Sequence, residues 1–196
     1  MSAAAASVDT LDALDAGEAT PLLASCCGAG EWVRRMLARR PFGSTDALLA
    51  AADEVWWSLS PADWREAFAH HPRIGERVAA AAQTTHAQAW SVGEQRGVAS
   101  SDDAVREALA SGNREYERRF GHIYLVSAAG KPAEELLAIL RQRLTNDSAT
   151  ELRSAAAEQA TITRLRLEKT LSALGPRLSA ERGGRAPGAE SREPLT

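Results

Sequence analysis

Helical spacing of apolar residues runs through nearly the whole chain, and it constrains the fold more than any other feature. One helical face collects Trp32, Val33, Met36 and Leu37. A second stripe, which follows the good N-cap residue Ser44, collects Leu48, Leu49, Ala52, Val55 and Trp56. A short apolar run at 123–126 has no partner strand in the sequence, so we interpret it as a buried connector. The sequence therefore predicts an all-α, single-domain multi-helix bundle.

Boundary signals place several of these helices. A serine cap, a proline at the first position and an acid in the first turn mark a helix start at 60–63. This helix should stop near His70 or His71, because the residue before Pro72 is disfavoured in helical geometry. Further helices are expected over 77–95, from 101–103 to Phe120-Gly121, from Pro132 to Leu144, and from Asn146 or Asp147 to about 174.

Length and composition bound the domain and its surroundings. The chain has 196 residues and a net charge of −3. We expect one domain over 8–174, mobile residues 1–7, and a disordered tail over 175–196, where proline, glycine and mixed charge replace the periodicity. No basic patch, membrane-length apolar run or signal peptide is evident, which predicts a cytoplasmic protein without nucleic-acid or membrane partners.

The two cysteines, Cys26 and Cys27, are adjacent. A disulfide between neighbours would be strained, so we expect reduced thiols that are buried as small hydrophobic side chains rather than a catalytic nucleophile. The only lysines are Lys131 and Lys169, which limits the scope for Schiff-base chemistry.

Side chains that could take part in catalysis are concentrated at 70–76, where the sequence is His-His-Pro-Arg-Ile-Gly-Glu. His71 can exchange a proton near neutral pH and sits beside a proline-fixed turn. Ser91 and Glu94 share a helical face with Trp90, and Gln95 lies beside Ser91. A carboxylate on an apolar stripe needs a partner. Two structural readings stay open: Glu94 reaches solvent at a frayed helix end, or His71 only closes its helix by a hydrogen bond.

One arginine of the last helix falls inside its apolar face. Arg166 lies near the centre of a face that also carries Gln159 and Ile162, whereas Arg164 points away. A buried guanidinium should meet a carboxylate or lie under a cavity that holds an anion. A structural ion pair with an internal acid is the alternative.

A metal site is the main chemical rival. Nitrogen and oxygen ligands could come from His70 or His71, Glu76, His86 and Glu94. Their spacing matches no known metal signature, so we expect no metal. A serine hydrolase is also disfavoured, since Ser91 lacks the glycine-X-serine-X-glycine elbow.

These motifs together resemble one family. The segments 64–68, 71–75 (His-Pro-Arg-Ile-Gly) and 91–97 (Ser-Val-Gly-Glu-Gln-Arg-Gly) are similar to 2-oxo-4-hydroxy-4-carboxy-5-ureidoimidazoline (OHCU) decarboxylases. Supporting matches are Cys27, Trp32, 40–42, Tyr116, 120–121, 130–131, 143–144, 146–147, 151–152, Ile162 and 166–167. The resemblance covers roughly residues 8–174 and leaves the tail outside.

The resemblance implies an all-helical, often dimeric enzyme of urate degradation that releases carbon dioxide and forms S-allantoin without a cofactor. It implies that His71 and Glu94 are catalytic. It implies that the small-molecule substrate is bound by Pro72, Ser91, Glu94, Gln95, Val126, Gly130 and Arg166, with backbone contacts over 126–130. This chain has Ile123-Tyr124 where proline-phenylalanine is commoner. A metal-dependent hydrolase of a ureide-type ring and a catalytically silent helical adaptor remain as alternatives.

Overall fold

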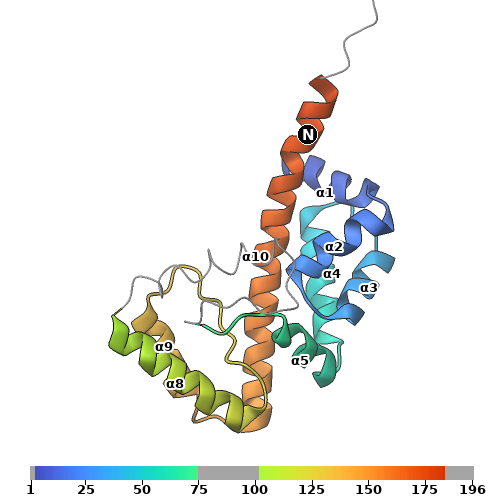
Figure 1. The fold of residues 1–196 in the computed structure, drawn as a ribbon. Helices are drawn as coiled ribbons and strands as arrows, with labels where there is room; N and C mark the ends of the chain where they lie inside the picture. The colour runs from blue at the N-terminus through green and yellow to red at the C-terminus, as the bar shows by residue number, and fades with distance from the viewer. Residues whose placement is uncertain (1–2, 75–101, 184–196) are drawn as a thin grey trace, which may run out of the picture.

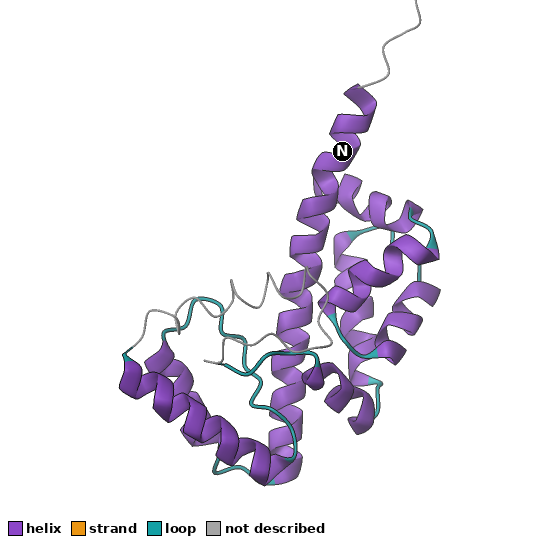
Figure 2. Ribbon diagram, in the orientation of Figure 1, coloured by secondary structure: helices purple, strands orange, loops and turns teal. Residues whose placement is uncertain are grey.

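The computed structural model describes residues 3–74 and 102–183, and every regular element in these two ranges is an α-helix (Figure 2). In chain order the helices are α1 (Ala3–Ala13), α2 (Ala16–Cys26), α3 (Gly30–Ala38), α4 (Thr45–Trp57), α5 (Pro61–Ala69), α8 (Asp103–Phe120), α9 (Ala133–Arg143) and α10 (Ser148–Gly183). The predicted all-α class is confirmed. Among the described helices, none carries a stretch apolar enough and long enough to cross a membrane.

The 36-residue α10 is the spine of the molecule. Figure 1 shows α1 to α5 gathered on one side of this helix and the α8–α9 hairpin on the other side, near its N-terminal part. Helix α10 packs against α1, α2, α4, α5 and α8, while α8 packs chiefly against α9. A residue on α10 can therefore connect the two groups of helices.

The boundary signals in the sequence act as expected. Ser44 and Ser60 accept hydrogen bonds at the starts of α4 and α5, and Ser60 forms a reciprocal capping box with Asp63. Asp102 caps α8, and Gly121 ends it with a left-handed φ of 73° that glycine adopts without strain. Asp147, rather than Asn146, caps α10 by accepting from the backbone N–H groups of 149 and 150.

Buried tryptophans tie the α1–α5 side of the core together. The indole of Trp56 on α4 donates to the carbonyl of Ala156 on α10 at 2.9 Å. The indole of Trp32 donates to the carbonyl of Ala52 at 3.2 Å, so α3 is tied to α4. Because each ring also buries a large apolar surface, these contacts fix the separation of the helices.

The structure differs from the expectations at both ends. Helix α1 includes residues 3–7, which were expected to be mobile, and α2 was not predicted although Asp15 and Glu18 form a capping box that the sequence already contained. Helix α10 runs to Gly183, past the expected end near 174. That expectation rested on the loss of periodicity after 175, where proline, glycine and mixed charge accumulate. A proline removes one hydrogen bond and bends a helix without forbidding its continuation. The predicted buried connector at 123–126 is confirmed.

Candidate active site

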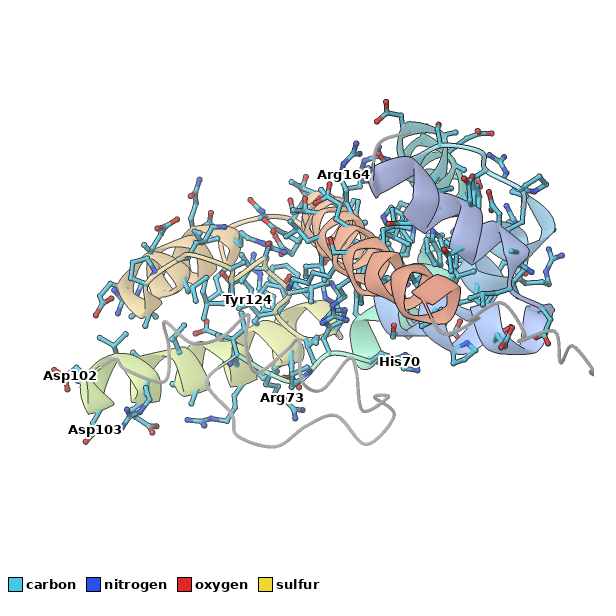
Figure 3. The ribbon with its side chains drawn as sticks, turned by 90° about the horizontal axis from the view of Figure 1, so that it is seen from above. His70, Arg73, Asp102, Asp103, Tyr124 and Arg164 are labelled. Carbon is cyan, nitrogen blue, oxygen red and sulfur yellow. The ribbon has the colours of Figure 1, made fainter. Side chains whose placement is uncertain are left out.

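The histidine-proline motif crosses from α5 to α8 just after α5 ends. The backbone N–H of His71 donates to the carbonyl of Phe68 at 3.0 Å, which closes the helix. Two residues on, Arg73 pairs with Glu117 of α8 through Nε–Oε1 (2.5 Å) and Nη2–Oε2 (2.8 Å), and Figure 3 shows it beside that helix. Asn113 of α8 donates to the carbonyl of residue 74 at 2.7 Å. The chain is therefore held on both sides of His71.

The imidazole of His71 is buried, with only 8% of the residue exposed. Burial lowers its pKa from 6.5 to about 3, and the positive charge of Arg166 acts in the same direction, as does His70 more weakly. A side-chain interaction with Gln159 opposes this shift. His71 is consequently neutral at physiological pH, so it can accept a proton or offer a lone pair but holds no positive charge of its own.

Gln159 of α10 is completely buried beside this ring. Its amide nitrogen Nε2 donates to Thr163 Oγ1 at 3.0 Å, one turn along the helix. Its Oε1 is buried without a hydrogen-bond partner among the described residues, and the Gln159 side chain raises the pKa of His71. The amide is thus placed between a hydroxyl and the imidazole.

The guanidinium of Arg166 is also buried, as its position on the apolar face predicted. Nη1 donates to the carbonyl of Ser25 at 3.4 Å, which places it against the end of α2. Its charge lowers the pKa of His71, Cys26 and Cys27, so all three lie within its electrostatic reach. Arg164 behaves in the opposite way: it is exposed and pairs with Asp53 at 2.9 Å, at the outer surface in Figure 3.

Both cysteines are free and buried at the end of α2. Burial raises the pKa of Cys26 to about 11 and that of Cys27 to about 12, more than Arg166 lowers them. Cys26 Sγ lies 3.4 Å from the hydroxyl of Thr170 on α10. Neutral, buried thiols agree with the prediction that they serve as small core side chains, because a nucleophile needs the thiolate.

The connector between α8 and α9 is fixed onto α10. The backbone N–H of Ser127 donates to Glu158 Oε2 at 2.8 Å, and Lys131 Nζ donates to the Ser127 carbonyl at 2.8 Å. Val126 is buried, whereas Gly130 is exposed in a turn at a φ of 77° that favours glycine. Glu158 directly precedes Gln159, so neighbouring residues of α10 hold the connector and face His71.

The structure therefore brings together His71 and Arg166, and it leaves Pro72 half-buried beside them in the chain. Ser91, Glu94 and Gln95 lie outside the described residues, as do Glu76 and His86 of the metal alternative. Sequence reasoning put Gln159 on the face of Arg166 but gave it no role, and it did not single out Thr163. A polar amide at the centre of an apolar helical face was the available signal.

A second buried arginine, Arg143 of α9, closes a different polar cluster. Arg143 Nε donates to Glu151 Oε1 at 2.7 Å, and Nη1 donates to the Leu125 carbonyl at 2.7 Å. The hydroxyl of Tyr116 also donates to Glu151, and Asn146 Nδ2 donates to its other oxygen at 2.7 Å. The ion pair with an internal acid that was considered for Arg166 thus exists at Arg143, where it joins α8, α9 and α10.

The described ranges contain no group of three or more histidine, cysteine, aspartate or glutamate side chains placed to hold a metal ion. Of the ligands considered for the metal alternative, His70 and His71 are described. The His70 ring Nδ1 lies 2.9 Å from the Glu66 carbonyl, within its own helix, and His71 faces Arg166 and Gln159.

A family model described as OHCU decarboxylase matches residues 12–168. The chain belongs to the OHCU decarboxylase family. It is 35% identical over 149 residues to the uric acid degradation bifunctional protein TTL of Arabidopsis thaliana, covering 75% of this chain and 45% of that protein. It thus spans less than half the length of this plant relative. It is 27% identical over 146 residues to the 2-oxo-4-hydroxy-4-carboxy-5-ureidoimidazoline decarboxylase of Haloferax volcanii, covering 72% and 82% of the two chains.

Solved structures give the same relationship. A crystal structure of OHCU decarboxylase in the presence of (S)-allantoin superposes with a TM-score of 0.66 at 30% identity and covers 76% of this chain and 96% of that one. A crystal structure of (S)-allantoin synthase gives a TM-score of 0.63 at 16% identity, covering 83% and 53%, and supports the fold alone. The part of this chain that superposes therefore covers nearly the whole of the first structure.

Proposed function

We propose that this chain decarboxylates 2-oxo-4-hydroxy-4-carboxy-5-ureidoimidazoline to S-allantoin in urate degradation, without a cofactor. The observation that carries the proposal is a neutral, buried imidazole, His71, within electrostatic reach of the buried guanidinium of Arg166, in a chain of the OHCU decarboxylase family. This pairing supplies a group that can accept a proton and a fixed cation for an anionic substrate.

The substrate supplies its own electron sink. The carbon that loses its carboxylate, C4, is next to C5 of the ring carbon–nitrogen double bond. The electron pair of the broken carbon–carbon bond therefore moves toward that nitrogen and leaves an enolate-like intermediate as carbon dioxide leaves. Arg166 and the amide of Gln95 hold the anionic, urea-like molecule. A fixed positive charge in a site closed to water stabilises developing negative charge more strongly than it would in solution.

The neutral state of His71 restricts its role in the proposed reaction. It first accepts a proton, from the substrate hydroxyl or in a pair with Glu94, and later returns it to C5, the neighbouring ring carbon that bears the ureido group, while C4 becomes a carbonyl. Delivery to one face of C5 sets the S configuration. A positioned acid-base group of this kind contributes about 10²–10⁴-fold to rate.

The other residues have proposed binding roles. Pro72, Ser91, Glu94 and Gln95 line the substrate, and the backbone from Val126 to Gly130 contacts its ring. The support for the last assignment is that Glu158 and Lys131 both hold the connector at Ser127. The proposal includes a homodimer and a cytoplasmic location; buried, reduced thiols suit a reducing compartment. Light scattering on a sizing column tests the dimer.

The decisive experiment generates the short-lived substrate from urate with urate oxidase and hydroxyisourate hydrolase and then adds this protein. The expected result is faster release of carbon dioxide and a circular-dichroism signal for S-allantoin instead of the racemate. Rates unchanged by the protein would indicate the silent adaptor. A rate that a chelator abolishes and added metal restores would indicate the metal-dependent hydrolase.

A further inference from the structure

The segment 71–74 crosses between the two apolar cores of the described chain. Phe68, near the end of α5, belongs to the core that α1 to α5 share with α10, whereas Ile74 belongs to the core of the α8–α9 hairpin. Figure 1 shows these two groups of helices on opposite sides of α10. His71 lies three residues from each of the two anchors. Because three residues span at most about 10 Å, the position of the hairpin limits where His71 can lie.

A buried amide makes the inner contact between this segment and α8. Asn113 Nδ2 donates to the carbonyl of Ile74 at 2.7 Å, and the asparagine is only 1% exposed. Its Oδ1 is buried without a hydrogen-bond partner among the described residues. A half-satisfied amide costs stability that an apolar side chain at the same place would not cost. The asparagine is therefore explained by the carbonyl that it holds and not by packing.

An ion pair makes the outer contact. Glu117, one turn after Asn113 on α8, accepts hydrogen bonds from Arg73 Nε at 2.5 Å and from Arg73 Nη2 at 2.8 Å. Two parallel bonds between a guanidinium and a carboxylate fix orientation as well as distance. The side chains of Arg73 and Glu117 are 45% and 26% exposed, so the pair adds little to global stability. Its main effect is on where residue 73 lies.

The same hairpin also carries the connector that is proposed to meet the substrate ring. Val126 and Ala128 pack in the hairpin core together with Ile74. Arg143 of α9 donates to the carbonyl of Leu125 at 2.7 Å, at the start of this stretch. The hairpin therefore holds both the segment that follows His71 and the connector, so a shift of α8 relative to α5 would change the geometry between them.

We propose that Asn113 and Glu117 are positioning residues. They hold residues 73 and 74 against α8, so that the α8–α9 hairpin sets where the His71 imidazole lies. Neither residue has to touch the substrate, because misplacing a reacting group by about 1 Å can cost roughly 100-fold in rate. The catalytic consequence rests on the proposed decarboxylase function, whereas the hold on the segment can be measured without substrate.

The first test measures amide hydrogen exchange in the full-length protein by mass spectrometry. The backbone N–H of His71 donates to the Phe68 carbonyl, so its exchange reports how firmly the segment is held. Glu117→Ala removes both acceptors of Arg73 and should speed exchange over 71–74 while the melting temperature hardly changes. Glu115→Ala is the matched control and should leave exchange unaltered, since Glu115 is exposed on the same helix and its side chain has no bonded partner within the described ranges.

Activity measurements give the second arm. We expect kcat per folded molecule to fall about 10-fold in Glu117→Ala with KM nearly unchanged, because Arg166 still holds the anion while the proton-transfer group is misplaced. Glu117→Gln keeps one acceptor oxygen, so it should recover part of both kcat and the exchange protection. A loss caused only by unfolding would follow the melting temperature instead. Asn113→Ala frees the buried carbonyl and should have the larger effect on kcat and on exchange.

The outcomes separate this proposal from the proposed function. Exchange over 71–74 that is unaltered in Glu117→Ala overturns the proposal, as does a kcat equal to that of Glu115→Ala. If Asn113→Ala does not fold, the Glu117 variants decide alone. A wild type that does not decarboxylate the substrate contradicts the proposed function, and the exchange comparison then decides by itself whether α8 holds the segment.

Discussion

Two buried arginines, Arg143 and Arg166, lie in surroundings of opposite character. Arg143 is matched by the carboxylate of Glu151 and by two further acceptors on α8 and the connector. The charge of Arg166 acts on an imidazole and two thiols, and all three are neutral at physiological pH. The first cluster balances its charge inside the fold, whereas the second places a positive charge near a neutral imidazole that can transfer a proton and near two thiols that belong to the core.

The comparison teaches that a buried arginine cannot be assigned from its burial alone. A charge that is paired within the fold stabilises the packing of the helices that carry it, and removing its partner exposes the full cost of burying the other charge. A guanidinium beside a neutral histidine has the arrangement expected for holding an anion that arrives from outside. Substitutions at matched positions of the two clusters should therefore separate stability from catalysis.

The largest expected effect is on turnover. His71→Ala removes the proton-accepting group and should lower kcat about 10²- to 10⁴-fold while the helical circular-dichroism spectrum is retained. His122→Ala is the matched change near the other cluster: the His122 ring packs against Phe68 and against Tyr116, whose hydroxyl donates to Glu151. It should lower the melting temperature and leave kcat of the folded fraction almost intact. A near-normal rate in His71→Ala would reject it as the proton carrier.

The next effect is on stability. Glu151→Gln keeps the shape of the side chain but leaves the charge of Arg143 without its carboxylate, so we expect a loss of about 3–5 kcal/mol in urea unfolding. Glu31→Gln is the control: Glu31 pairs with Arg34 and Arg35 at the surface, and this change should hardly move the curve. Equal effects of the two changes would contradict the role given to the buried pair.

A pH dependence of stability follows from His71. Its ring stays neutral in the folded protein down to pH about 3, whereas in the unfolded chain it gains a proton below about 6.5. The unfolded state binds more protons in this window, so stability falls as the pH falls, by up to about 1.4 kcal/mol per pH unit. The free energy of unfolding, measured in urea at several pH values between 7 and 4, should change less with pH in His71→Asn than in the wild type. The burial of His122 acts in the same direction and should leave a residual slope.

The smallest expected effect is on substrate binding. Arg166→Lys keeps the charge but loses the planar fork, so we expect KM to rise about 10-fold, which corresponds to about 1.4 kcal/mol, with a smaller change in kcat. Arg143→Lys is the matched control. We expect it to lower the free energy of unfolding and to leave KM unchanged. An unchanged KM in Arg166→Lys would count against its contact with the substrate.

The sequence predicts local features of this protein well. The start of α5 at Ser60-Pro61 and the end of α8 at Gly121 are confirmed because capping depends on residues near each other in the chain. The angular difference between Arg164 and Arg166 also holds, since the helical period alone decides it.

Contacts between distant segments were not predictable in this way. The pairing of Arg143 with Glu151 depends on the turn between α9 and α10, and the placement of Gln159 against His71 depends on how α5 meets α10. Spacing can show that Gln159 faces inward, but not which group it meets there. The roles of Ser91, Glu94 and Gln95 came from the family resemblance and stay predictions.

The first described helix and the last one pack against each other: α1 lies along α10, and a Cβ built on Gly175 would come within 3.0 Å of Ser7 Oγ. During synthesis on the ribosome, α1 to α5, α8 and α9 leave the exit tunnel before α10, against which five of these helices pack: α1, α2, α4, α5 and α8. The apolar faces of α1, α2 and α4 therefore remain exposed until α10 emerges. Nascent chains halted before α10 should engage chaperones, and release of the full-length chain should end that association.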